Sequence, residues 1–327
     1  MLLYHHGDWL VKFFWIISGF VFAFVYWSKN ISLKKFFVAR FARLYPLHLI
    51  TLGFIVIFQT INYFSFGYYQ IVVTNDLYHL MLQFFMASNW GFQETSSFNS
   101  PIWSISVEVL VYALFFSTLK FLNIKPFLIS ITSLVLLLLL SSLIPLGHHF
   151  IAQCGFFFYT GVLMFLITKK FEKKPVYLFI ISMCIFIVAL YVYNYLPSIE
   201  STLLQNNVLA VSQRTSILIF MYVVTMGLTF SGIILFLAWI DTKQYMHVFS
   251  YQFKWVGNST YSIYLWHVPI QVFILFMIDT YAVNRAIFDS KLIFLLWILF
   301  MIVVGRLSYI YIESPLKLKI KKYYGER

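Results

Sequence analysis

Residues Phe13 to Pro46 read FFWIISGFVFAFVYWSKNISLKKFFVARFARLYP. The stretch begins as an apolar segment, continues as a short basic loop, and ends in an Arg-x-x-Arg-Leu-Tyr-Pro start to a second apolar segment. An apolar helix of about 20 residues is long enough to cross the hydrocarbon core of a bilayer. Lysine and arginine are retained on the cytoplasmic side of a membrane. The stretch therefore predicts two transmembrane helices that are joined in the cytoplasm.

The rest of the chain has the same apolar character. Of its 327 residues, 61% are hydrophobic and 10% are charged, and the mean hydropathy is +0.85. One soluble core cannot bury so many apolar side chains, so we expect an all-α polytopic transmembrane helical bundle that forms a single integral-membrane domain over residues 1–327. The formal net charge of +12 does not indicate nucleic-acid binding, because the basic residues lie between apolar segments and orient helices there.

Nine apolar segments have the length of a membrane span. They lie near residues 9–28, 44–63, 101–122, 126–146, 150–168, 175–193, 215–239, 257–279 and 291–312. The stretch from Asp76 to Ser88 is too short to span, so we expect it to lie in the interface or to dip into the membrane and return.

The basic residues orient the spans. Eighteen of the 23 lysines and arginines lie after the first, third, fifth, seventh and ninth apolar segments. The positive-inside rule then places the C-terminus in the cytoplasm and Met1 outside. A chain of nine spans that begins outside, without a signal peptide, is expected of a ten-span protein that lacks its first helix.

Five motifs, in order along nearly the whole chain, resemble the membrane acyltransferase-3 family of bacterial O-acyltransferases. They are FFxxxSGF at 13–20, ARFARLYP at 39–46, WSISVE at 103–108, GNSTYSIYLWH at 257–267 and ESP at 313–315. The resemblance implies a protein of the bacterial inner membrane. It further implies transfer of an acyl group, usually acetyl from cytoplasmic acetyl-CoA, to a carbohydrate hydroxyl of an envelope or secreted glycan.

The same resemblance implies a catalytic base near the N-terminus. In that family a first helix, preceded by arginines, ends in a histidine that serves as the base, and the opening MLLYHHG is similar to the last turn of that helix. His5 or His6 would occupy the position of the base. We expect either a true start upstream of Met1 or an inactive truncated acyltransferase. The alternative for both histidines is a place in a solvated tail.

Acyl transfer to a hydroxyl needs a base, a donor for the developing oxyanion, and cations for the phosphates of the coenzyme. Glu108 lies inside a predicted span, where an ionised side chain is expensive. It could orient and charge-stabilise a histidine, bind hydroxyls of the acceptor, or form a structural pair with another helix.

His267 lies in the middle of a predicted span. Thr260, Tyr264, His267 and Gln271 fall on one face of the helix, and a polar face should be turned to protein or water. The imidazole could line the reaction cavity, since its pKa is normally near neutrality. The alternative is a structural hydrogen bond between helices.

Three arginines are candidate contacts for the coenzyme. Arg40 and Arg43 share a helical face at the membrane surface, which suits phosphates or lipid headgroups, although basic residues there also fix topology. Arg306 lies deep in the last span. It could contact the phosphates or the thioester oxygen of the donor, or pair with Glu313 or Glu108.

Other features have plainer interpretations. Ser18 and Gly19 are expected to allow close helix packing, and Asp8 should form a salt bridge with Lys12. The loop 64–100 is rich in aromatic residues, for which a membrane-interface belt is favoured over the stacking of sugar rings.

The sequence lacks the motifs of several other kinds of site. It holds no dinucleotide-binding or phosphate-loop glycine motif and no cluster with metal-ligand spacing. Cys154 and Cys184 lie in apolar runs and are interpreted as small core residues.

The rival function is a glycan or lipid transporter or flippase, with the buried charges as a substrate path. Paired broken helices in two related halves would favour it, but the sequence shows no such symmetry.

Overall fold

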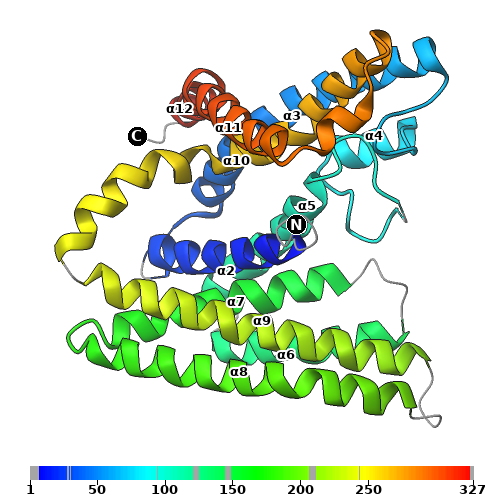
Figure 1. The fold of residues 1–327 in the computed structure, drawn as a ribbon. Coiled ribbons are helices and arrows are strands. Elements are labelled where there is room, and N and C mark those ends of the chain that lie inside the picture. Colours follow the sequence, from blue (N-terminus) through cyan, green and yellow to red (C-terminus); the bar gives the residue numbers. More distant parts are fainter. Residues whose placement is uncertain are drawn as a thin grey trace. The chain divides into compact units, whose positions relative to one another are not determined.

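The computed structural model describes residues 7–27, 29, 31–93, 95–120, 125–143, 149–205, 211–242 and 244–324. Across these ranges every regular element is a helix, which confirms the predicted all-α class (Figure 1). Eight of the helices are long and apolar enough to cross a membrane. The chain is therefore a multi-pass membrane protein.

The helices follow the expected segments. They are α2 (Gly7–Tyr26), α3 (Leu33–Phe66), α5 (Ile102–Lys120), α6 (Pro126–Leu143), α7 (His149–Lys170), α8 (Val176–Gln205), α9 (Val211–Asp241), α10 (Gln244–Thr280) and α11 (Lys291–Ser308). Helix α11 continues through the π-helical turn η3 (Tyr309–Glu313) into α12 (Ser314–Tyr323), and two short helices, α4 (Leu77–Phe84) and η2 (Arg285–Asp289), lie in loops. At the fourth expected segment, the stretch Pro126–Leu137 of α6 counts among the shorter apolar helices and not among the eight that are long enough to span.

The basic loop after α2 is shorter than expected. Helix α3 begins at Leu33, where the hydroxyl of Ser32 caps it by accepting a hydrogen bond from the backbone N–H of Lys35 at 3.4 Å. Arg40 and Arg43 therefore lie on the helix itself. The difference arises because hydropathy marks the membrane core, whereas a capped helix can begin outside it.

The chain folds into two compact units. The first comprises Met1–Asn30 and Val107–Val248, and the second comprises Ile31–Ser106 and Phe249–Arg327. One of the three boundaries lies just before α3, and the other two fall within α5 and α10, so the WSISVE motif contributes residues to both units.

In the first unit, α2 packs against α7, α8 against α9, and α6 against both α7 and α9 (Figure 1). Helices α2 and α7 cross at two glycines: a Cβ at Gly19 would overlap the carbonyl of Phe158, and one at Gly161 would overlap the carbonyl of Ile16. The prediction that Gly19 permits close packing is confirmed.

Two further expectations concern the same unit. Lys12 and Asp8 form the expected salt bridge at 2.8 Å. Cys154 is buried as expected, but Cys184 is exposed on α8, which corrects its interpretation as a core residue. An apolar side chain of a membrane protein can face lipid as readily as a core, and hydropathy does not separate the two.

In the second unit, α12 packs against α3, and α10 is tied to α3 by the hydroxyl of Tyr261, which donates to the carbonyl of Leu44 at 2.6 Å. An apolar cluster joins α3, the loop before α5, and α10; its buried members are Leu52, Ile55, Phe98, Val268 and Val272.

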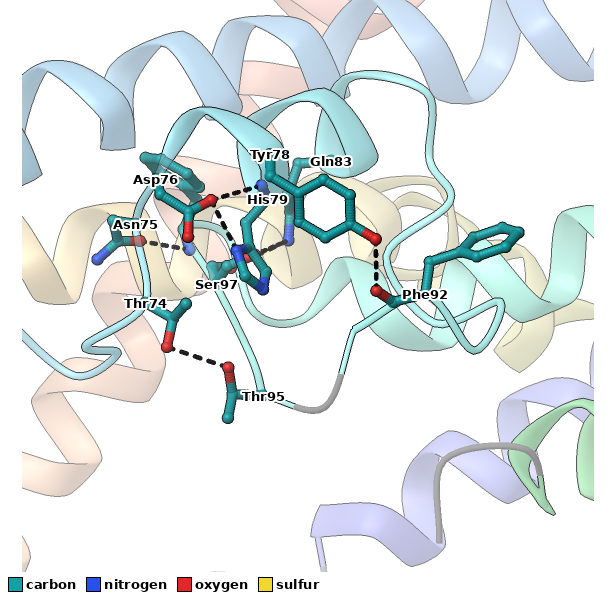
Figure 2. Close-up of polar contacts among 10 residues, drawn as sticks. Thr74, Asn75, Asp76, Tyr78, His79, Gln83, Phe92, Thr95 and Ser97 are labelled. Carbon is teal, nitrogen blue, oxygen red and sulfur yellow. Dashed lines mark hydrogen bonds and ion pairs between the residues drawn. The ribbon is translucent and has the colours of Figure 1, made fainter. Parts of the chain in front are cut away.

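Helix α4 begins the part of this unit that connects α3 to α5. Asp76 caps it, accepting hydrogen bonds of 2.8 Å from the backbone N–H and from ring Nδ1 of His79 (Figure 2). The loop that follows is held to α4, because Tyr78 donates to the carbonyl of Phe92 at 2.6 Å and the amide of Gln83 donates to the carbonyl of Ser97 at 3.0 Å. We call residues 77–93 and 95–100 the re-entrant segment.

Candidate functional site

The imidazole of His267 is fixed by its own helix. Its Nδ1 lies 2.6 Å from the main-chain carbonyl oxygen of Tyr264. A carbonyl only accepts hydrogen bonds, so Nδ1 must carry the proton and the neutral ring presents the lone pair of Nε2. A half-buried imidazole in this tautomer is poised to accept a proton.

The side chain of Tyr264 anchors the same turn of α10 to the start of α5. Its hydroxyl donates to the carbonyl of Pro101 at 2.9 Å and lies 2.7 Å from the hydroxyl of Ser104. One residue further along, the carbonyl of Leu265 accepts a hydrogen bond of 3.2 Å from the side-chain amide of Asn99. The polar face predicted for α10 is therefore turned toward protein at Tyr264 and His267.

A group of cations gathers where α12 packs on α3. The charges of Arg40, Arg43 and Lys321 all act on the half-buried Lys317. The carboxylate of Glu313 also acts on it, and its Oε2 accepts a 2.7 Å hydrogen bond from the hydroxyl of Ser262. We call Arg40, Arg43, Lys317 and Lys321 the basic cluster.

Three members of the basic cluster lack an ion-pair partner within the described part of the chain. Among the described residues, neither Arg43 nor Lys317 nor Lys321 has a carboxylate within ion-pair distance. These three cations make a site that favours an anion, such as a phosphate.

The guanidinium of Arg306 lies near two aromatic rings. An ion pair with a carboxylate was one of the alternatives for this residue. Its guanidinium carbon lies 5.9 Å from the ring centroids of both Trp255 and Tyr309. No ion pair with Glu313 forms within the part of the chain that the structure describes. Cation–π contacts orient a guanidinium while leaving N–H groups for other acceptors.

Glu108 belongs to the first unit and is 2% exposed. Its charge acts on the thiol of Cys154 in α7. One turn along α5, the hydroxyl of Tyr112 lies 3.5 Å from that of Ser18 in the SGF motif, and its ring stacks on Phe22 with centroids 4.2 Å apart. The SGF motif of α2 thus meets α5 at Tyr112, one turn after the end of the WSISVE motif.

The predicted site residues are divided between the two units. Arg40, Arg43, His267 and Arg306 belong to the second unit, and Glu108 to the first. His5 and His6 lie outside the described residues.

The sequence does not single out two residues of these contacts. Lys317 counts there only among the basic residues that set the topology, although its position one turn after Glu313 could have marked it. Asn99 is only one of the amide residues of the loop 64–100. The signal that could have found it is Pro269, because a proline within a span leaves the carbonyl four residues earlier in need of another donor.

Comparisons with known proteins agree with the sequence resemblance. A family model described as an acyltransferase domain, acyltransferase-3, matches residues 5–312. The chain is similar to the O-acetyltransferase OatA of Staphylococcus aureus strains NCTC 8325 / PS 47, COL and MRSA252. Each is 24% identical over 364 residues, which cover 98% of this chain and 55% of the relative. The chain thus spans about half the length of the curated relatives it matches. No solved structure matches it.

Proposed function

The chain belongs to the acyltransferase-3 family, and from this premise we propose that it is a membrane O-acyltransferase. It moves an acyl group, acetyl in the simplest case, from cytoplasmic acyl-CoA to a hydroxyl of a cell-surface or secreted glycan. The observation that carries the proposal is the hydrogen bond from Nδ1 of His267 to the carbonyl of Tyr264, since it presents Nε2 as a base inside the second unit.

The reaction needs two proton transfers, one to a base and one from it. An imidazole takes the proton of the acceptor hydroxyl as the oxygen attacks the thioester carbonyl. The new C–O bond forms, the C–S bond breaks, and the proton passes to the departing thiolate. We assign the imidazole to His267 or His5. The buried carboxylate of Glu108 stabilises the imidazolium or accepts from the acceptor's hydroxyls.

The basic cluster supplies the site for the coenzyme. Acyl-CoA carries a diphosphate and a 3′-phosphate, which Arg40 and Arg43, joined by Lys317 and Lys321, would meet with cations. Within the described part of the chain, Arg43, Lys317 and Lys321 have no ion-pair partner. We assign Arg306, held between Trp255 and Tyr309, to the phosphates or the thioester oxygen of the donor.

The charge distribution supports the same arrangement. By the positive-inside rule, the start of α3 and the C-terminal helix α12 face the cytoplasm, where acyl-CoA is made. The bacterial inner membrane is the proposed location, with the C-terminus in the cytoplasm.

The test uses a strain that expresses the full-length gene. Glu108→Gln, and replacement of both His5 and His6, should each abolish O-acetylation of the glycan at a normal protein level. Asp8→Asn is the matched control, because it makes the same carboxylate-to-amide change in an exposed ion pair of α2 and should leave acetylation unchanged. Unchanged O-acetyl content in Glu108→Gln would contradict the role of that carboxylate, and unchanged content in the double histidine variant would exclude His5 as the base.

A further inference from the structure

The re-entrant segment turns back deep along α3. Near the outer end of α3, Gln59 exchanges two hydrogen bonds with the backbone of Gln70, at 2.7 and 2.9 Å. Further along the chain, the carbonyl of Gln83 lies 2.7 Å from Nε2 of His48, and the carbonyl of Phe84 accepts from Tyr45 at 2.7 Å. Gln59 and His48 lie about 16 Å apart along a helix axis. Of the two places expected for this stretch, we take the one that dips inward.

The innermost part of the segment is a buried polar network. The amide of Gln83 donates to the carbonyls of Ser97 and Asn99, and the amide of Asn99 donates to the hydroxyl of Thr51. His48 and Asn99 are 0% exposed and Gln83 is 1% exposed. Buried polar groups at this depth normally have partners for every atom.

Three atoms of this network have no such partner. They are Nδ1 of His48, Oε1 of Gln83 and Oδ1 of Asn99, each without a hydrogen bond among the described residues. All three are acceptors. Nε2 of His48 faces a carbonyl and so carries the proton, which leaves Nδ1 with its lone pair.

The two side-chain amides are oriented by the same reasoning. Asn99 donates to the carbonyl of Leu265, and Gln83 donates to that of Ser97, so the bonded atoms must be nitrogens and the partnerless atoms oxygens.

The backbone beside the network is strained. Met86 and Phe98 are buried, and both have positive φ angles, of 54° and 36°. Bulky residues rarely adopt this conformation, and such strain gathers at sites of function. Non-helical backbone at membrane depth is tolerated where it is buried in protein or lines a polar cavity.

We infer that the re-entrant segment forms a binding subsite for the hydroxyl groups of a carbohydrate, with His48, Gln83 and Asn99 as hydrogen-bond acceptors. The inference rests on the proposed function, because it names the place of the acceptor. A ligand that satisfies three uncharged acceptors must offer donors, and neutral hydroxyls do so without bringing a charge into the membrane.

The experiment uses the full chain in lipid nanodiscs with radiolabelled acetyl-CoA. The probe is the de-O-acetylated envelope glycan of the source bacterium. Gln83→Met should raise the KM for glycan at least tenfold and leave the KM for acetyl-CoA unchanged. Gln59→Met is the control: its two amide atoms are already bonded to Gln70, so it should change thermal stability without changing the glycan KM. Should Gln83→Met fail to fold, His48→Gln, which keeps a donor toward the carbonyl of Gln83, should raise the glycan KM instead.

A second measurement separates this inference from the proposed function. Hydrogen exchange of residues 77–93 and 95–100, followed by mass spectrometry, should slow when the glycan is added, whether or not acetyl is transferred. Protection without transfer would support the subsite and contradict the proposed function. Transfer with an unchanged glycan KM in the folded variants, or no protection by the glycan, would overturn the subsite.

Discussion

The side-chain amide of Asn99 donates a 3.2 Å hydrogen bond to the main-chain carbonyl of Leu265. Leu265 lies four residues before Pro269, which has no N–H, so its carbonyl cannot receive the usual helical hydrogen bond. The loop residue thus replaces the donor that proline removed from α10. This relationship ties the re-entrant segment to the helix that carries His267.

The relationship predicts thermodynamic coupling between Asn99 and Pro269. Asn99→Leu should destabilise the protein by about 1 to 3 kcal/mol, because it leaves a buried carbonyl without a donor. Pro269→Ala restores an N–H for that carbonyl, so the double variant should be more stable than the sum of the single effects by about 1 kcal/mol or more. The free energy of unfolding is measured in mixed detergent for the wild type, the two single variants and the double variant. Simple additivity would contradict the compensation.

A second prediction concerns the crossing of α2 and α7. Gly19→Ala should destabilise the first unit by about 1 to 3 kcal/mol, since the added Cβ would overlap the carbonyl of Phe158 and push the helices apart. Gly53→Ala on α3 is the control, because nothing lies within 4 Å of the added atom, and alanine favours helix over glycine. Thermal unfolding in detergent should order the proteins as Gly53→Ala, wild type, Gly19→Ala, from most to least stable. Equal melting temperatures for the two variants would refute the close approach.

Hydropathy predicted which segments are helical better than it predicted where each helix begins. It found all nine helical segments because a span of apolar residues is a long, strong signal. It placed the start of α3 within the apolar run, although the Ser32 cap begins that helix at Leu33. A cap is a local hydrogen bond that hydropathy does not record.

The sequence named candidate site residues but not their contacts. It pointed to His267 by residue type and spacing, and to Arg40 and Arg43 through the family resemblance. Contacts of the re-entrant segment depend on pairings between distant residues, such as Asn99 with Leu265, which no periodicity encodes. The same holds for Arg306, whose aromatic neighbours Trp255 and Tyr309 were not among the partners that the sequence suggested.

The third prediction tests the tautomer of His267. His267→Phe should lower the rate of acyl transfer by about 10²-fold or more, because the lone pair of Nε2 is lost. Tyr264→Phe is the control, because it removes a hydroxyl that bonds to Pro101 yet keeps the carbonyl that orients the imidazole. Its effect should be several-fold smaller. Rates are measured with radiolabelled acetyl-CoA at matched protein levels, and equal losses in both variants would assign His267 a structural role.

The fourth prediction concerns the basic cluster. Lys317→Gln should raise the KM for acetyl-CoA about tenfold, the equivalent of one charge-assisted hydrogen bond. Lys319→Gln removes the same charge from an exposed position of α12 and should leave the KM close to that of the wild type. Raising the ionic strength should weaken binding less in Lys317→Gln than in the wild type. Equivalent KM values for the two lysine variants would show that only the net charge matters.

The last prediction concerns acid and the start of the re-entrant segment. Hydrogen bonds from the backbone N–H of His79, and then from its ring, hold the pKa of Asp76 below its usual value of 3.8. A lowered carboxyl pKa stabilises the folded state above the unfolded-state pKa, and this contribution is lost as the pH falls through the folded-state pKa. Hydrogen exchange in α4 should therefore speed up in the wild type below about pH 4, beyond the intrinsic change with pH. Asp76→Asn keeps a capping oxygen without a titrating group, so its α4 should show no such acceleration. Matching pH profiles in the two proteins would show that the Asp76 carboxylate does not hold the start of α4.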